Sequence, residues 1–249
     1  MPNNSEYDRI FKQRSSDYDL AMQRFPNARD QEFLRLFDHI DLSNISTMAD
    51  LPSGGGYLGK FLPDTCKIEA YEPCSDFNAN QAHTFDVGLD DVVLPESGFD
   101  AVVCLAAIHH VQNKTKFVTN LYNAVRPGGY LLLADVWAEN PISSFLDDFA
   151  GKHNGTGHNG MYLGKETIHN IIEPLGASIV NIEQKNCPWQ FASIQEMLDF
   201  CRLLFGLRKV SDDDLLNALE SLVHYTTTEH GVSLAWQLLY HTINRPGSL

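Results

Sequence analysis

The sequence predicts an α/β fold in which a doubly wound, mostly parallel sheet carries helices on its faces. Three observations predict it. Strand-like and helix-like segments alternate from residue 45 onward, and residues 99–105, FDAVVCL, form the near-continuous apolar run of a strand buried on both faces. Between the first strand and the next helix lies a glycine-rich turn, where missing Cβ atoms let a ligand approach the backbone. The glycine-rich turn suggests a cofactor-binding domain.

Residues 1–44 precede the first strand and read as a helical leader. Sparse apolar residues before Arg24 predict one or two short helices, which Pro26 interrupts. Helical spacing over residues 33–40 then predicts a helix of about three turns. We expect this leader to cap the domain formed by residues 45–249.

The remaining elements follow from periodicity and from turn residues. Strands are expected at residues 45–49, 67–71, 84–89, 99–105, 130–134, 177–184 and 232–243. Helices are expected at residues 57–62, 114–125, 142–150, 165–175, 194–205 and 215–222, the last capped by Ser211 and the acids after it. Residues 126–129, RPGG, are interpreted as a structural stop between a helix and the fifth strand.

Composition and charge restrict the function. The chain has 249 residues, and 18 Lys and Arg against 32 Asp and Glu give a net charge of −14, which disfavours nucleic acid and anionic membranes as partners. Five scattered cysteines, with no CxxC pair, indicate neither a disulfide framework nor a thiolate zinc site. No targeting or membrane-spanning segment is recognised, so a cytoplasmic protein without membrane insertion is expected.

The glycine turn alone allows several interpretations. The spacing Gly54-x-Gly56-x-x-Gly59, followed by Glu72 at the end of the second strand, fits the fingerprint of a nicotinamide-dependent dehydrogenase. However, a leader precedes the turn, and Pro52 stands where the tight turn of that fingerprint would begin. The glycines are also compatible with a flexible turn, and Glu72 with a solvated strand end.

Four elements in order resemble the class I S-adenosylmethionine-dependent methyltransferases. They are the glycine turn in residues 47–60, TMADLPSGGGYLGK, the acid Glu72, residues 94–111, LPESGFDAVVCLAAIHHV, and residues 125–136, VRPGGYLLLADV. The resemblance points to the small-molecule group that includes methyltransferase type 11 and ubiquinone/menaquinone-type enzymes. It implies a Rossmann-like, seven-stranded sheet whose last strand is antiparallel.

The resemblance also implies cofactor contacts in the first motif. Asp50, Pro52, Gly54, Gly55 and Gly56 match D-x-G-x-G-x-G, with Pro52 in place of the first glycine. The methionine half of S-adenosylmethionine is expected to run past these residues.

Further cofactor contacts are implied after strands two, three and four. Glu72 is expected to accept hydrogen bonds from both ribose hydroxyls. For the adenine, Asp90 is favoured, with Asp91 next and Asp86 possible. Leu105 and Ala106 are expected beneath the sulfonium.

His109 and His110 follow the fourth strand on the predicted cofactor side. Methyl transfer from a sulfonium releases a neutral thioether, so a base is needed only if the acceptor must lose a proton. Either histidine is a candidate base or substrate anchor, because imidazole titrates near neutrality. One of the two is equally compatible with a structural role.

A loop near residues 137–165 is interpreted as a substrate lid, with a plain surface loop as the alternative. His153 and His158 lie in it, and Tyr7, Tyr18 and Trp137 are further candidates to line the acceptor pocket rather than the core. No third ligand joins the two histidines by spacing, so no metal is predicted.

The sequence therefore predicts an enzyme that transfers a methyl group from S-adenosylmethionine, leaving S-adenosylhomocysteine, to oxygen, nitrogen or carbon of a small molecule. The alternatives are an NAD(P)-dependent dehydrogenase and a methyltransferase-like protein that binds the cofactor without activity. Neither the acceptor nor the oligomeric state follows from the sequence.

Overall fold

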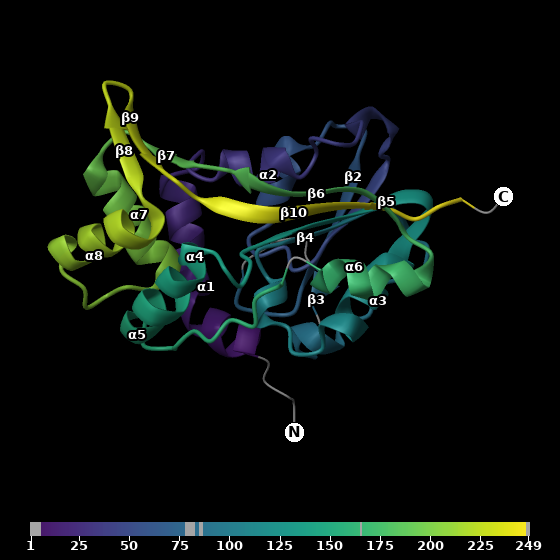
Figure 1. The fold of residues 1–249 in the computed structure, drawn as a ribbon, viewed down its shortest axis with the longest axis horizontal. Helices are drawn as coiled ribbons and strands as arrows, with labels where there is room; N and C mark the ends of the chain where they lie inside the picture. Colours follow the sequence, from purple (N-terminus) through teal and green to yellow (C-terminus); the bar gives the residue numbers. More distant parts are fainter. Residues whose placement is uncertain (1–5, 78–82, 85–86, 165, 248–249) are drawn as a thin grey trace.

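The computed structural model describes residues 6–77, 83–84, 87–164 and 166–247, and it has the predicted α/β architecture. Its centre is a seven-stranded sheet with the strand order β3-β2-β1-β4-β5-β10-β6 (Figure 1). The strands in this order are His83–Thr84, Lys67–Glu72, Thr47–Asp50, Phe99–Leu105, Val125–Asp135, Gln237–Asn244 and Ser178–Asn186.

Strands β3, β2, β1, β4 and β5 are parallel, whereas β10 runs antiparallel between β5 and β6. Leu239 of β10 lies opposite Asp135 of β5 and Gln184 of β6. The predicted seven strands with an antiparallel last strand are thus confirmed. Because parallel strands share one direction, the carboxyl ends of β1, β2, β4 and β5 lie at the same edge of the sheet, where ligands bind in open α/β folds.

Strand β4 is buried on both faces, as its apolar run predicts. Ala101 and Val103 point into a core shared with the leader and with helix α7 (Ile194–Phe205). Val102 and Cys104 point into the other core, under helix α3 (Lys114–Ala124). This alternation follows from the two-residue period of a strand.

The leader begins with one helix of 19 residues, α1 (Glu6–Arg24), followed by α2 (Asp30–Arg35). The first helix is longer than predicted, and α2, with 6 residues, is shorter than three turns. Helix α1 packs against α7, and ion pairs from Arg24 to Asp199 and from Arg208 to Asp17 border this contact. Helix α1 is stabilised by packing against α7, which lies much later in the chain. The sparse apolar pattern of α1 alone therefore predicted a helix that is too short.

The C-terminal strand is divided in two, contrary to the single strand predicted over residues 232–243. Strand β9 (Gly231–Leu234) pairs with β7 (Trp189–Phe191) and β8 (Tyr225–Thr228) in a separate three-stranded sheet at one end of the molecule (Figure 1). Trp236, between β9 and β10, stacks on Trp189 with ring centroids 4.0 Å apart. The buried tryptophan pair fixes the point at which the chain passes from one sheet to the other.

Several predicted boundaries also change. The glycine turn leads into a short 3₁₀ helix, η2 (Tyr57–Phe61), and the third strand is reduced to β3 followed by η3 (Leu89–Asp91). Residues 126–129 lie within β5 instead of capping a helix. The other helices are α4 (Pro141–Ser144), the π-helical turn η5 (Phe145–Ala150), α5 (Gly151–His153), α6 (Thr167–Ile172) with η6 (Glu173–Leu175), and α8 (Asp212–Ala218) with η7 (Leu219–Val223).

Gly129 is required where β5 passes β4. A Cβ atom there would overlap the carbonyl oxygen of Asp100 and lie 2.8 Å from Cγ1 of Val125. Gly129→Ala is therefore expected to lower the free energy of unfolding by about 2–3 kcal/mol, which corresponds to roughly 4–12 °C in thermal midpoint. Gly59→Ala is the matched control, because no heavy atom lies within 4 Å of the Cβ position. Thermal unfolding followed by circular dichroism measures both variants, and equal midpoints would contradict the packing argument.

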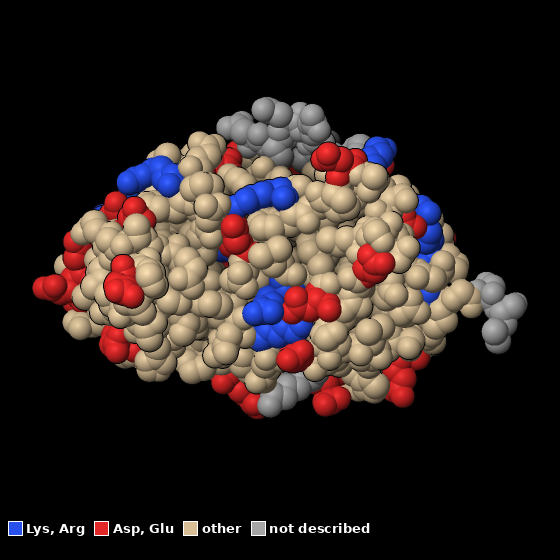
Figure 2. Space-filling view, turned by 90° about the horizontal axis from the view of Figure 1, so that it is seen from above, with Lys and Arg blue, Asp and Glu red and all other residues tan. Residues whose placement is uncertain are grey.

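On the face drawn in Figure 2, the described lysine and arginine side chains lie close to acidic ones. Within the described part of the chain, no helix has the length and apolar character needed to cross a bilayer.

Candidate active site

A cavity of about 130 Å³ opens at the carboxyl ends of β1 and β4 and continues beneath α1. Ten of the residues singled out from the sequence line it: Tyr7, Tyr18, Asp50, Pro52, Gly54, Leu105, Ala106, His109, His110 and His158. Seven do not line it, namely Gly55, Gly56, Glu72, Asp90, Asp91, Trp137 and His153. Asp86 lies outside the described residues.

The glycine turn forms one end of the cavity. Asp50 closes β1, and Gly54 and Gly56 have φ angles of 52° and 77°, which glycine adopts without the strain of a side chain. The turn is fixed by hydrogen bonds from the Ser53 amide to the carbonyl of Tyr71, and from the Gly56 amide to Ser53. The Leu51–Pro52 peptide bond is cis. A ligand in the cavity would therefore meet exposed backbone at Gly54.

Glu72 lies beside this turn with its carboxylate enclosed by protein groups. The amides of Gly54 and Cys74 donate to it at 2.7 Å and 2.8 Å, and the Tyr7 hydroxyl donates at 3.0 Å. Burial raises the pKa of Glu72 to about 8, against the effect of these donors. Burial and the nearby Glu72 carboxyl also raise the pKa of Asp50 well above its usual value. Leader residue Tyr7 thus occupies the oxygen that a ribose hydroxyl would need.

The two aspartates after β3 have local partners. Oδ1 of Asp90 accepts hydrogen bonds from the amides of Gln112 and Asn113 at 2.7 Å and 3.0 Å, and Asp91 pairs with Lys116 at 2.5 Å. Asp90 therefore holds the segment that leads into α3, while Asp91 stands at the surface.

The cavity floor is formed where β4 ends. Ala106 has a φ angle of 53°, uncommon for a residue with a side chain, and its amide donates to the carbonyl of Ala134 at 2.7 Å. Leu105 and Ala107 line the cavity on either side of it. The small side chains leave room for a ligand close to the backbone.

His109 is oriented by Asp135, a residue to which the sequence analysis gave no role. Asp135 ends β5, is 1 % exposed, and accepts from the His109 amide at 2.9 Å while its other oxygen lies 2.7 Å from Nδ1. With the carboxylate ionised, Nδ1 carries the proton and Nε2 keeps a free lone pair. The sequence could have predicted this pair, because His109 follows β4 and Asp135 ends β5. Adjacent parallel strands place their carboxyl ends side by side.

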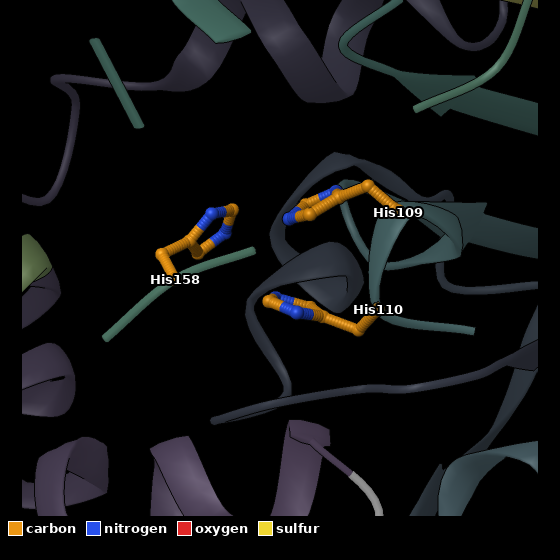
Figure 3. A group of neighbouring side chains, drawn as sticks. All are labelled: His109, His110 and His158. Atoms are coloured by element: carbon orange, nitrogen blue, oxygen red, sulfur yellow. The ribbon is translucent and has the colours of Figure 1, made fainter. Parts of the chain in front are cut away.

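His158 reaches the same place from the loop after α5. Its ring centroid lies 5.3 Å from that of His109 and 5.1 Å from that of His110 (Figure 3). Asp147 holds Nδ1 of His158 at 2.5 Å and also accepts from the Tyr162 hydroxyl at 2.9 Å. Burial lowers the pKa of both His110 and His158, so these imidazoles are neutral at pH 7.

Two candidates from the loop lie elsewhere. Trp137 is buried and forms a bridge with Leu163 instead of lining the cavity, because the chain there continues directly from β5. His153 is exposed, and its Nδ1 lies 2.8 Å from the carbonyl oxygen of Phe149.

The leader contributes two arginines that the sequence analysis did not single out. Arg29 lines the cavity in an ion pair with the buried Glu32 at 2.6 Å. Arg14 is also buried against the cavity, where Nη2 donates to the carbonyl of Leu204 at 2.5 Å. Among the described residues it forms no salt bridge, and its Nε has no hydrogen-bond partner. Burial lowers the pKa of Arg14 to about 10, which still leaves it charged at pH 7. No sequence pattern distinguishes Arg14 from the surface arginines.

Residues 65–133 match a protein-family model described as a methyltransferase domain. This stretch of the chain is similar to methyltransferase domains. The match agrees with the predicted superfamily, with methyl transfer as the reaction and with S-adenosylmethionine as the cofactor. No curated protein sequence matches the chain significantly.

Solved methyltransferase structures resemble this chain over most of its length at low identity. A putative methyltransferase from Bacillus halodurans is 16 % identical with a TM-score of 0.55, covering 93 % of this chain and 99 % of that one. A possible histamine N-methyltransferase from Thermotoga maritima is 13 % identical with a TM-score of 0.58, covering 94 % and 98 %. Phosphoethanolamine N-methyltransferase 2 from Haemonchus contortus, solved with phosphomonomethylethanolamine and S-adenosylhomocysteine, is 13 % identical with a TM-score of 0.62, covering 98 % and 61 %.

Proposed function

We propose that this protein transfers a methyl group from S-adenosylmethionine to a small-molecule acceptor bound beneath α1. The observation that carries the proposal is the continuity of the cavity, which joins the glycine turn at Gly54 and the β4 end at Ala106 to a chamber lined by the leader. In-line displacement needs the acceptor atom and the methyl group aligned in a dry space, and one cavity that reaches both places meets that requirement.

The residues at the glycine turn fit the cofactor. When bound, S-adenosylmethionine supplies an activated methyl group on a sulfonium. Gly54 would offer its backbone to the methionine half, and Asp50 would face the amino group. Glu72 would receive the ribose hydroxyls once Tyr7 withdraws its hydroxyl, since Tyr7 is the one side chain among its three donors.

The acceptor chamber favours a molecule with an apolar body and one anionic group. Its walls are mainly aromatic and aliphatic and include Trp189, Phe205 and Trp236. Arg14 is a charge in this wall that has no salt-bridge partner among the described residues, and its hydrogen bond to the Leu204 carbonyl does not neutralise it. Burying a charge without an opposite charge beside it is costly. A carboxylate or phosphate of the acceptor would offset that cost.

Arg14→Gln is expected to remove a preference for anionic acceptors. The unmodified protein should methylate aromatic carboxylic acids at least about tenfold faster, in kcat/KM, than the matching neutral amides, because a charge-assisted hydrogen bond contributes roughly 1.5–3 kcal/mol. Arg24→Gln is the control, since Arg24 is an exposed partner of Asp199. Transfer of radiolabelled methyl groups to paired acceptors measures the ratio, and a preference for the amides would contradict this acceptor class.

We also propose that the protein is cytoplasmic and that its partners are free small molecules. The net charge of −14 and the mixed charges on the face in Figure 2 support the exclusion of nucleic acid as the acceptor.

Calorimetric titration with S-adenosylmethionine and S-adenosylhomocysteine is the first test of the proposed reaction. Failure of the folded protein to bind either compound would overturn it. A broad acceptor screen with labelled cofactor is the second test, because binding without transfer to any acceptor identifies a cofactor-binding protein without activity.

A further inference from the structure

Three histidines from two distant segments converge on one point of the cavity. His109 and His110 lie in the 3₁₀ turn η4 (Ile108–His110) after β4, and His158 follows α5. Each histidine offers one ring nitrogen, and these three nitrogens lie within 4.8 Å of one another, so that the rings surround a common space (Figure 3). Open, catalytic zinc sites have three protein ligands, and three imidazoles in this arrangement match that number.

Two of the three rings are each held by a carboxylate at Nδ1. Asp135 lies 2.7 Å from Nδ1 of His109, and Asp147 lies 2.5 Å from Nδ1 of His158. A carboxylate that fixes the far nitrogen of a histidine sets the tautomer and directs the Nε2 lone pair toward a ligand. Two carboxylate–histidine pairs aimed at one point match the outer support that metal-binding histidines have.

The third ring, His110, is 4 % exposed, and its Nδ1 has no hydrogen-bond partner among the described residues. A buried polar nitrogen without a partner is rare in folded proteins, because its desolvation is not offset. A ligand shared with His109 and His158 would give it one.

We propose that His109, His110 and His158 bind one divalent transition-metal ion of the zinc class, with its remaining coordination position open to the cavity. Three imidazole nitrogens favour Zn²⁺ or Co²⁺ over Mg²⁺ or Ca²⁺, which prefer oxygen ligands. A tetrahedral ion with Zn–N distances of about 2.0–2.1 Å places its nitrogens roughly 3.4 Å apart, so the rings close around the ion by small side-chain rotations. Asp135 and Asp147 provide negative charge next to it.

The metal site stands without the methyl-transfer proposal, since it depends only on the three rings and their carboxylates. If the proposed function also holds, the open position would take an oxygen, sulfur or nitrogen atom of the acceptor. His109 then serves as a ligand and not as a base, because a single Nε2 lone pair cannot do both.

The test uses the full chain without a histidine tag, freed of metal by a chelator and titrated with Zn²⁺ in a calorimeter. One ion per chain is expected, together with the visible absorption of tetrahedral Co²⁺ when cobalt replaces zinc. His110→Ala and His158→Ala should each lower the Zn²⁺ affinity about 100-fold or more, and Asp147→Asn about 10- to 100-fold. His153→Ala is the control, because this exposed histidine of the same loop lies outside the cluster.

Absence of stoichiometric binding, or an affinity unchanged in both His110→Ala and His158→Ala, would overturn the metal site and leave the rings as a polar wall of the cavity. Circular dichroism of each variant establishes that it is folded. S-Adenosylmethionine titrations of the same samples keep the outcomes separate: a protein that binds zinc but no cofactor retains the metal site and loses the proposed function.

Discussion

Replacing Glu72 by alanine is expected to weaken S-adenosylmethionine binding about tenfold or more. The carboxylate sits at the end of β2, next to Gly54, where it would accept the ribose hydroxyls through charge-assisted hydrogen bonds of roughly 1.5–3 kcal/mol. Isothermal titration measures the affinity. Glu69→Ala is the matched control, because Glu69 lies on the same strand and pairs with Lys67. An unchanged affinity in Glu72→Ala would remove this residue from the cofactor site.

The same carboxyl makes the affinity depend on pH. The pKa of Glu72 is raised to about 8 in the ligand-free protein, so at pH 6 most molecules carry the neutral acid. Ribose hydroxyls favour the carboxylate, and binding at low pH must therefore release a proton. The affinity should rise by up to about tenfold per unit from pH 6 to 8 and level off above 8. Glu72→Gln should remove this slope, and a slope that persists in that variant would assign it to another group.

Tyr7 is a second check on the Glu72 assignment. Its hydroxyl donates to Oε2 of Glu72, so it competes with the ribose for that oxygen. Tyr7→Phe retains the aromatic ring and removes the competitor, and it should bind the cofactor more tightly than the unmodified chain. Weaker binding would show that Tyr7 supports the bound cofactor instead of competing with it.

Replacing His109 by alanine is expected to lower kcat for methyl transfer about 100-fold or more while the cofactor affinity changes little. His109 lines the cavity, and Asp135 holds the residue there through its backbone amide and its Nδ1. Both roles considered for His109, base and metal ligand, act on the acceptor and not on the cofactor. Single-turnover kinetics with labelled cofactor measures the loss. Full activity in the variant would exclude both roles.

Two further variants accompany the measurement of kcat in His109→Ala: Asp135→Asn tests the support of the ring, and His230→Ala is the control. The asparagine keeps the shape of the side chain but removes the charge that stabilises the Nδ1–H tautomer, so kcat should fall while the fold is retained. His230 is exposed and does not line the cavity, so its replacement should leave the rate unchanged. If zinc added to chelator-treated protein restores the rate, His109 acts as a ligand, whereas a rate indifferent to metal supports the base.

The sheet could be predicted from the sequence because the patterns that specify it involve residues close together in the chain. The apolar run of β4 and the glycines before η2 each reflect a short-range requirement: burial on both faces in one case, and a positive φ at Gly54 and Gly56 in the other. The same signals placed Asp50, Gly54, Ala106 and His109 at one edge of the sheet, since parallel strands bring their carboxyl ends together.

The bounds of helices and strands were predicted less accurately where packing between distant parts of the chain determines them. The Trp189–Trp236 stack divides the C-terminal strand, and the contact with α7 makes α1 a single helix. Neither effect has a local pattern, because the partners lie far apart along the chain.

By itself, the sequence determined the class I sheet, the glycine turn and the pair His109–His110. Only the tertiary structure brought His158 to that pair and placed Asp135 and Asp147 against the rings. It also left Arg14 in the cavity wall without a salt bridge to any described residue. The reason is physical: backbone requirements act over a few residues, whereas a site assembled from the leader, two strand ends and a loop depends on how those segments pack.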